Sequence, residues 1–96
     1  MHAVVRSYSG AGVQELFDRI EQHREEVEGL IRGVPGFLSY TIVRSSDSAS
    51  SITVCQDKAG TDASSGVARE WIQANAADLS VDPPAITEGP ATVHFS

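Results

Sequence analysis

The sequence predicts an α+β fold in which one four-stranded antiparallel sheet carries two helices on a single face. Two observations support this class. Segments with period-two alternation and segments with three-and-four spacing follow one another in the order strand, helix, strand, strand, helix, strand. The 96-residue chain also has 41% hydrophobic and 21% charged residues, which suits a single domain over residues 1–96 with one core.

The first strand and the first helix are predicted from the amino-terminal third of the chain. His2–Tyr8 is short, rich in Val and Tyr, and followed by a Ser-Gly-Ala-Gly break, as is typical of a strand. From Val13 to Arg32 apolar residues recur at helical spacing, although His23 or Arg24 interrupts them. Acidic and basic residues three or four apart occupy the other side. The segment therefore predicts one amphipathic helix with a solvated, charged face.

A Gly-Val-Pro-Gly turn is predicted to end this helix and start a hairpin. Gly33 is expected to adopt the left-handed conformation of a helix end, and the following proline cannot donate the next hydrogen bond. Gly36 then lets the chain turn. Phe37–Arg44 alternates as a strand, and the loop Ser45–Ser50 leads into its antiparallel neighbour, Ser51–Gln56.

The last third predicts a second helix and a final strand. Thr61 or Asp62 is the predicted cap of a helix running to about Asn75. Ala85–Thr87 is a short strand segment, Gly-Pro interrupts it, and Ala91–Phe95 is the predicted last strand. One face of the helix carries Val67, Ala68, Trp71, Ile72 and Asn75. The element order is the split βαβ arrangement of the ferredoxin-like fold.

Alternation divides the strand residues between two faces of the sheet. The more apolar set, expected beneath the helices, is Leu38, Tyr40, Ile42, Ile52, Val54, Val93 and Phe95. The opposite set is Phe37, Ser39, Thr41, Val43, Ser51, Thr53, Cys55, Thr92 and His94. Either Val4 and Arg6 or Val5 and Ser7 join that opposite set. Its mixed face is either wetted by solvent or covered by a second copy.

Charge and composition exclude several classes of function. The net charge of −6 and the scattered basic residues argue against nucleic acid and anionic membrane as partners. No long apolar run and no signal-peptide pattern are present, so the cytoplasm is the expected location. Cys55 is the only cysteine, which excludes an internal disulfide and a thiolate zinc cluster. No metal is expected, and "SGAGVQ" lacks the Lys-Ser or Lys-Thr of a nucleotide-binding loop.

Five side chains are candidates for chemistry, each with a structural alternative. His94 is the candidate acid or base, because imidazole titrates near neutral pH, and the alternative is an exposed histidine. Arg6 could bind a carboxylate or phenolate or form a salt bridge at the rim. Tyr40 could donate a phenolic hydrogen bond or simply pack. Cys55 is either a nucleophile or a small buried hydrophobe. Trp71 either faces a pocket or anchors the second helix.

The element order, the chain length and the segment "VPGFLSYTIV" resemble the dimeric α/β-barrel superfamily. Its branches include antibiotic-biosynthesis-monooxygenase-like proteins and stress-responsive barrel proteins. The resemblance implies a homodimer in which two ferredoxin-like protomers oppose their sheets. It also implies ligand pockets inside the barrel or between each sheet and its helices.

The resemblance leaves two functions open. The third strand ends in "VCQDKAG" without a following Trp, and the second helix has no His, which argues against haem degradation, and no cofactor is expected. One function is binding of a small aromatic or carboxylate metabolite without catalysis. The alternative is a cofactor-independent, monooxygenase-like enzyme acting on an aromatic substrate, with His94, Arg6 and Tyr40 as acid-base or anion-binding groups.

Overall fold

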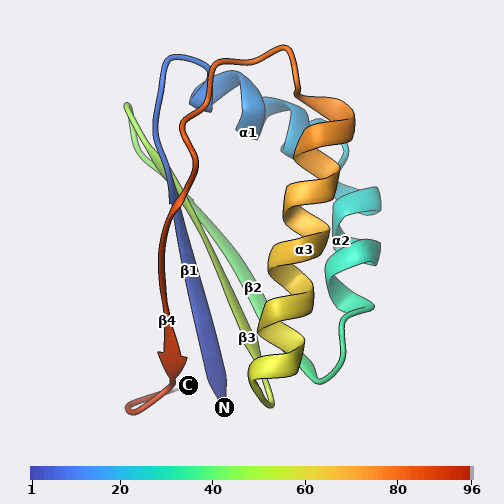
Figure 1. The fold of residues 1–96 in the computed structure, drawn as a ribbon, viewed down its shortest axis with the longest axis vertical. Coiled ribbons are helices and arrows are strands. Elements are labelled where there is room, and N and C mark those ends of the chain that lie inside the picture. Colours follow the sequence, from blue (N-terminus) through green and yellow to red (C-terminus); the bar gives the residue numbers. More distant parts are fainter. Residues whose placement is uncertain (96) are drawn as a thin grey trace.

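The computed structural model describes residues 1–95. All three of its helices lie on one face of a four-stranded antiparallel sheet (Figure 1). The elements in chain order are β1 (His2–Tyr8), α1 (Val13–Gln22), α2 (Arg24–Arg32), β2 (Phe37–Arg44), β3 (Ala49–Cys55), α3 (Lys58–Asn75) and β4 (Ala85–Pro90). The predicted α+β class and the antiparallel β2-β3 hairpin are therefore confirmed.

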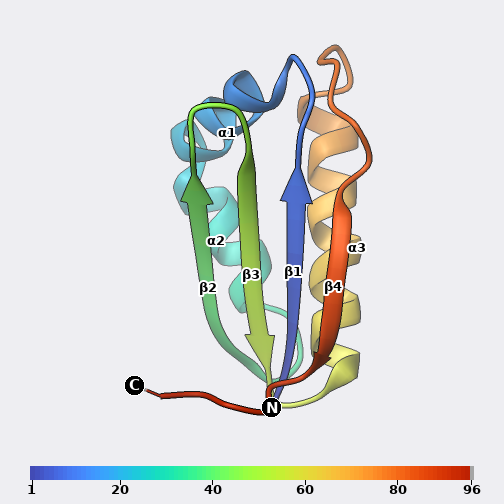
Figure 2. The same cartoon turned by 90° about the vertical axis from the view of Figure 1, so that its left-hand side faces the viewer.

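The sheet has the strand order β2-β3-β1-β4, which Figure 2 shows from the side that the helices leave open. In the central strand β1, Arg6 pairs with Ser51 of β3 and with Ile86 of β4. The next residue towards the amino terminus, Val5, pairs with Ile52 and points to the opposite face. This order is that of the ferredoxin-like fold.

The predicted first helix is two helices, because the chain breaks at His23. The backbone of His23 is non-helical, with φ −107° and ψ 31°. Its N–H donates to the carbonyl oxygens of Arg19 and Ile20, and its ring Nδ1 lies 2.9 Å from the same Arg19 oxygen. A ring donor on that carbonyl competes with the regular helical bond. The interruption of the apolar pattern at His23 or Arg24 thus corresponds to the break between α1 and α2.

The turn into β2 depends on Gly36 and not on Gly33. Gly33 has ordinary right-handed backbone angles, φ −77° and ψ −8°, so the predicted left-handed helix end was wrong. Gly36 has φ +67°, which L residues rarely adopt. A Cβ there would also meet Gln56 of the next turn at 3.1 Å. Gly36 therefore fixes how the chain enters the hairpin.

The last two elements have different bounds from those predicted. Asp57 caps α3 by accepting a hydrogen bond from the Gly60 N–H, so the helix starts before Thr61. The last strand is Ala85–Pro90, and Ala91–Phe95 is not a strand. Antiparallel pairing with β1 ends where Pro90 meets His2. Gly89-Pro90 therefore closes the strand, where a bulge within it was expected.

The faces of β3 are the reverse of the prediction, whereas those of β2 agree with it from Ser39 to Val43. Before Ser39 the register shifts, and Phe37 pairs with Cys55 and packs against Arg32 of α2, although the open face was predicted for it. Buried and half-buried residues alternate along β3, and the buried ones are Ala49, Ser51, Thr53 and Cys55. Ile52 and Val54 thus point to the open face. In β1 the buried residues are Val4, Arg6 and Tyr8, which resolves the ambiguity of that strand. Polar side chains consequently line the helix side of the central strands.

The core lies where the helices meet the half of the sheet that contains Tyr8, at the end of β1, and Ala49, at the start of β3. Its buried members are Tyr8, Val13, Leu16, Phe17, Ile20, Ala49, Trp71 and Ala76. Ion pairs tie α1 to its surroundings: Arg44 of β2 to Asp18 and Glu21, and Arg19 to Asp78 in the turn after α3. Within residues 1–95 no helix is both long and apolar enough to cross a membrane.

Candidate binding site between the sheet and the helices

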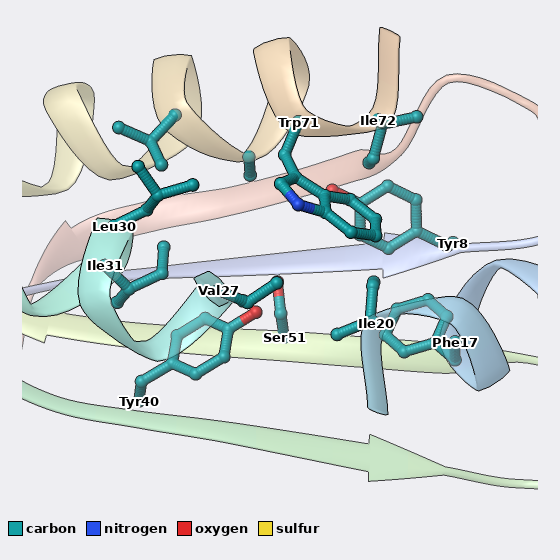
Figure 3. A pocket seen from close by; sticks show the side chains of 12 residues that line it. Tyr8, Phe17, Ile20, Val27, Leu30, Ile31, Tyr40, Ser51, Trp71 and Ile72 are labelled. Carbon is teal, nitrogen blue, oxygen red and sulfur yellow. The ribbon is translucent and has the colours of Figure 1, made fainter. Parts of the chain in front are cut away.

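A small cavity lies between the sheet and all three helices (Figure 3). Apolar side chains form most of its wall, among them Phe17 of α1, Val27 of α2 and Trp71 of α3. Tyr40 and Ser51 bring hydroxyl groups from the sheet, and in Figure 3 the Tyr40 hydroxyl points towards Ser51. The cavity measures about 30 Å³, which leaves room for about one or two water molecules.

A much larger groove runs outside this cavity along the edge strand β2. It measures about 690 Å³ and is walled by β2 on one side and by the end of α1 and α2 on the other. Four residues line both spaces: Ile20, Val27, Ile31 and Tyr40. The groove and the inner cavity therefore have part of their walls in common. The groove has the volume of ordinary small-molecule pockets.

Trp71 holds α3 against the joint between α1 and α2. Its indole Nε1 donates to Glu26 Oε1 at 2.9 Å, and its ring packs edge-on against His23 at 5.9 Å between centroids. The predicted face of the second helix is confirmed for its apolar members, since Val67, Ala68, Trp71 and Ile72 all line the cavity. Asn75, predicted on the same face, is exposed and does not line the cavity. Trp71 is thus both an anchor and part of the cavity wall.

Arg6 is buried directly behind the cavity wall, with a side chain only 2% exposed. Its Nη1 donates to Ser51 Oγ at 3.0 Å and to Thr53 Oγ1 at 3.2 Å. Its Nε donates to Ser65 Oγ at 3.2 Å, and its Nη2 donates to Ser64 Oγ at 2.6 Å. Across residues 1–95, no carboxylate forms an ion pair with it. The alternative of a salt bridge at the rim is therefore wrong.

The hydroxyl groups around Arg6 are the part of the site that sequence reasoning missed. Ser51 and Thr53 come from alternate positions of β3, and Ser64 and Ser65 come from α3. The Ser64 hydroxyl in turn donates to the Thr61 carbonyl. Two signals were present in the sequence: hydroxyl residues with period two on a strand, and a Ser-Ser pair within a helix.

Burial and the charge of Arg6 act in opposite directions on the pKa values of two nearby tyrosines, Tyr8 and Tyr40. Burial raises the pKa of Tyr8 and of Tyr40, because the phenolate is poorly solvated there. The Arg6 charge acts in the other direction on both, and the Ser51 hydroxyl also lowers the pKa of Tyr40. Burial lowers the pKa of Arg6 itself. Both phenols therefore remain neutral hydrogen-bonding groups at neutral pH.

Cys55 lies away from the cavity, at the end of β3 opposite His2. Its side chain is fully buried, and burial raises the pKa of its thiol. A thiol that stays protonated is a poor nucleophile. The structure therefore favours the small buried hydrophobe over the nucleophile, and it does not place Cys55 on the cavity wall.

His94 lies in the segment after β4, which leaves the sheet at the end where the chain begins (Figure 2). The Ala91 N–H donates to the Met1 carbonyl oxygen, and the residues beyond it are exposed. The predicted strand that would have held His94 beside a substrate does not form. Arg6, Tyr40 and Trp71 are brought together by the fold, whereas His94 and Cys55 are not. Among residues 1–95 no cluster of potential metal ligands occurs.

Solved structures with the same fold include two that are described as oxygenases. One is described as a monooxygenase from the gene ActVA-Orf6 of Streptomyces coelicolor in complex with nanaomycin D, with TM-score 0.71, 20% identity, and coverage of 99% of this chain and 91% of that one. Another is SnoaB, a cofactor-independent oxygenase from Streptomyces nogalater, with TM-score 0.66, 17% identity, and coverage of 98% and 95%.

A third similar structure is a protein of unknown function from Nitrosomonas europaea, with TM-score 0.73, 16% identity, and coverage of 99% of this chain and 92% of that one. No protein-family model and no curated protein matches the sequence. The similar structures thus confirm the predicted fold of the chain.

Proposed function

We propose that the protein binds a small aromatic molecule in the groove along β2, with one end of the molecule reaching the inner cavity. The observation that carries this proposal is the pair of adjoining spaces, which share Ile20, Val27, Ile31 and Tyr40 as a common wall. A ring system fits the groove, whereas the cavity admits only an atom or two. The inner cavity has aromatic and aliphatic walls with few polar groups, as is typical of such sites. The wall of the groove also includes the charged residues Glu21, Arg24, Glu28 and Arg32.

Trp71 provides a direct readout for binding, because it is the only tryptophan in the chain and lines the cavity. We expect 1-naphthol to cause a saturable shift of the single indole N–H cross-peak in a ¹H–¹⁵N spectrum. The same titration with a saturated bicyclic alcohol of similar size should give a weaker shift. Absence of saturation up to millimolar naphthol would contradict the proposal.

A matched pair of variants on α3 locates the binding. Ala68→Leu adds a branched side chain to the cavity wall, and should weaken naphthol binding at least tenfold. Ala74→Leu makes the same chemical change at an exposed position of the same helix, and should leave binding unchanged. Equal affinities for the two variants would place the ligand elsewhere.

A cofactor-independent oxygenase is the second candidate function. It is favoured by the similar structures, two of which are described as a monooxygenase and a cofactor-independent oxygenase, and by the cation and phenols beside the cavity. In such a reaction a phenol and O₂ give a quinone and water, and the substrate itself supplies the electrons that reduce the second oxygen atom. Arg6, Tyr8 and Tyr40 could stabilise the phenolate from which electrons leave.

Oxygen consumption with 1-naphthol as substrate tests this second candidate. An enzyme should consume O₂ above the rate of the protein-free solution, in equal amount to the quinone formed. The His94→Ala variant tests the acid–base role of His94: lost turnover with retained binding supports it, and unchanged turnover excludes it. Binding without O₂ uptake would leave the binding function alone.

We further propose that a second copy of the chain covers the open face of the sheet. That face carries Val5, Ile52 and Val54 in its centre and exposes Val43 on β2. The tail after β4 lies on the same side of the sheet (Figure 1) and exposes Val93 and Phe95 by 75% and 90%. Apolar side chains grouped in this way are typical of an interface.

A further inference from the structure

Arg6 is a buried cation without a buried anion. The residue is 2% exposed, and its guanidinium donates hydrogen bonds to neutral hydroxyl groups alone. Removing a charge from water costs several kcal/mol, and buried charges are therefore usually paired with an opposite charge. A methionine or leucine would fill this place at lower cost. The arrangement thus requires an explanation beyond the stability of the fold.

The ionisable groups that face Arg6 do not supply the missing charge. They are Tyr8, Tyr40, Cys55 and Glu88. Burial raises the pKa values of the two phenols and of the thiol, so all three are neutral near pH 7. Glu88 is an exposed residue on the edge strand β4 and forms no ion pair within residues 1–95.

The cation lies one hydroxyl group away from the inner cavity. Ser51 lines the cavity and also accepts the 3.0 Å hydrogen bond from Arg6 Nη1. A hydroxyl that accepts from a cation directs its own hydrogen elsewhere and becomes a better donor. Tyr8 and Tyr40 add two further hydroxyl groups to the cavity wall. At about 30 Å³ the cavity has room for one or two oxygen atoms but not for a ring.

We propose that the protein binds its aromatic ligand as an oxyanion, with the phenolate or carboxylate oxygen in the inner cavity against Ser51 and Arg6 supplying the opposite charge from behind it. This inference rests on the proposed binding function and names the class of ligand: an aromatic ring in the groove with one acidic oxygen group at the end that enters the cavity. Tyr8 and Tyr40 would donate to the same oxygen.

4-Nitrophenol tests the phenolate form, because its absorption differs between phenol and phenolate. We expect the apparent pKa of the bound probe to fall by about one unit or more relative to the free probe, as for an acid placed near a fixed cation. The Arg6→Met variant should abolish the shift. Arg69→Met removes the same charge from an exposed position on α3, and should preserve it.

A second pair of probes tests the carboxylate form. 4-Nitrobenzoate and 4-nitrobenzamide share ring and shape, and differ in charge. Wild-type protein should bind the benzoate at least tenfold more tightly, and the preference should disappear in Arg6→Met alone. A pKa shift of bound 4-nitrophenol without a preference for the benzoate would show that the cavity binds phenolates. A preference for the benzoate without a pKa shift would show that it binds carboxylates.

The outcomes separate the two proposals. If no probe binds, the binding function is wrong and the inference is wrong with it. If the probes bind but show neither a pKa shift nor a charge preference, or if both persist in Arg6→Met, the inference alone is overturned. If Arg6→Met does not fold, the NMR signal of Arg6 Nε–H in the wild-type protein tests the inference instead. This signal should shift on addition of 4-nitrobenzoate and remain unchanged with 4-nitrobenzamide, and a signal that ignores both probes would overturn the inference.

Discussion

Arg6 shows how a single side chain determines the identity of its neighbours. Its side chain enters the space between β1 and α3, where each of its hydrogen bonds ends on a serine or threonine oxygen. Small hydroxyl residues are the ones that can reach a guanidinium without adding a second charge. Period-two burial of Ser51 and Thr53 on β3 is therefore explained by the cation opposite them.

Removing the cation and removing one of its partners should have opposite effects on stability. Arg6→Met eliminates the desolvation cost, and we expect the free energy of unfolding to stay equal or rise. Ser64→Ala leaves Nη2 without its 2.6 Å partner, and should lower the free energy of unfolding by about 1–3 kcal/mol. Urea denaturation measures both, with the exposed loop variant Ser46→Ala as control. A less stable Arg6→Met would show that Arg6 holds the fold together.

The Arg19–Asp78 ion pair makes a pH-dependent contribution to stability. Hydrogen bonds from Arg19 lower the pKa of Asp78 from 3.8 to about 2. A carboxyl whose pKa is lower in the folded state stabilises the fold fully above its unfolded pKa, and this contribution is lost as the pH falls through the folded pKa. The stabilisation should thus be complete above about pH 4 and absent below about pH 2.

Melting temperatures of the wild type and of Asp78→Asn measure this contribution. The difference between them should be constant near neutral pH and close as the pH falls from about 4 to about 2. Asp82→Asn alters an exposed carboxylate without an ion-pair partner in residues 1–95, and should show no such closure. A difference independent of pH would mean that Asp78 acts through its shape and not its charge.

Among the elements, the sequence predicted how strands and helical segments alternate and the apolar residues that α3 buries, but it did not predict that the first helical segment is divided into α1 and α2. It did not predict which face of β3 is buried, because Ile52 and Val54 are the more apolar residues and hydrophobicity favours burying them. The buried cation on β1 reverses that choice. The position of His94 was also mispredicted, since Gly89-Pro90 ends the pairing with β1 where a bulge was expected.

Two glycines of α3 differ in whether a larger side chain would fit: Gly60 has no room for a Cβ atom, whereas Gly66 has. A Cβ at Gly60 would lie 2.7 Å from Cys55 Cβ and 2.9 Å from its Sγ, and would collide with the Pro35 carbonyl. Gly60→Ala should therefore lower the free energy of unfolding by about 2 kcal/mol or more. Gly66 has no atom within 4 Å of such a Cβ, and Gly66→Ala should stabilise by about 0.5–1 kcal/mol.

Chemical denaturation of both variants provides the test, since each makes the same substitution in one helix. Equal changes in the free energy of unfolding would show that helix propensity alone determines the effect of both substitutions. A large loss at Gly60 with a gain at Gly66 would confirm that α3 packs directly on the end of β3. This close approach is what places Ser64 and Ser65 within reach of Arg6.

At the scale of the whole molecule, the two faces of the sheet have different roles. The face beneath the helices carries polar groups around Arg6, and the open face carries aliphatic side chains such as Val5 and Ile52. An isolated protomer thus exposes the side that hydrophobicity would bury. The proposed dimer removes this contradiction, because the aliphatic face becomes an interior when a second sheet covers it.

A single charge at the centre of the open face should separate the two copies. Ile52 lies in the row between Val5 of β1 and Thr41 of β2, so Ile52→Lys places an ammonium group in the proposed interface, where it would lose its hydration without a partner. Light scattering coupled to size exclusion should give a dimer of two 10.2 kDa chains for the wild type and a 10.2 kDa monomer for Ile52→Lys. Ala74→Lys adds the same charge to the exposed side of α3 and should remain dimeric. If the wild type is itself a monomer, or if Ile52→Lys remains dimeric with native circular dichroism, the copies do not meet through this face, and its aliphatic residues need another partner.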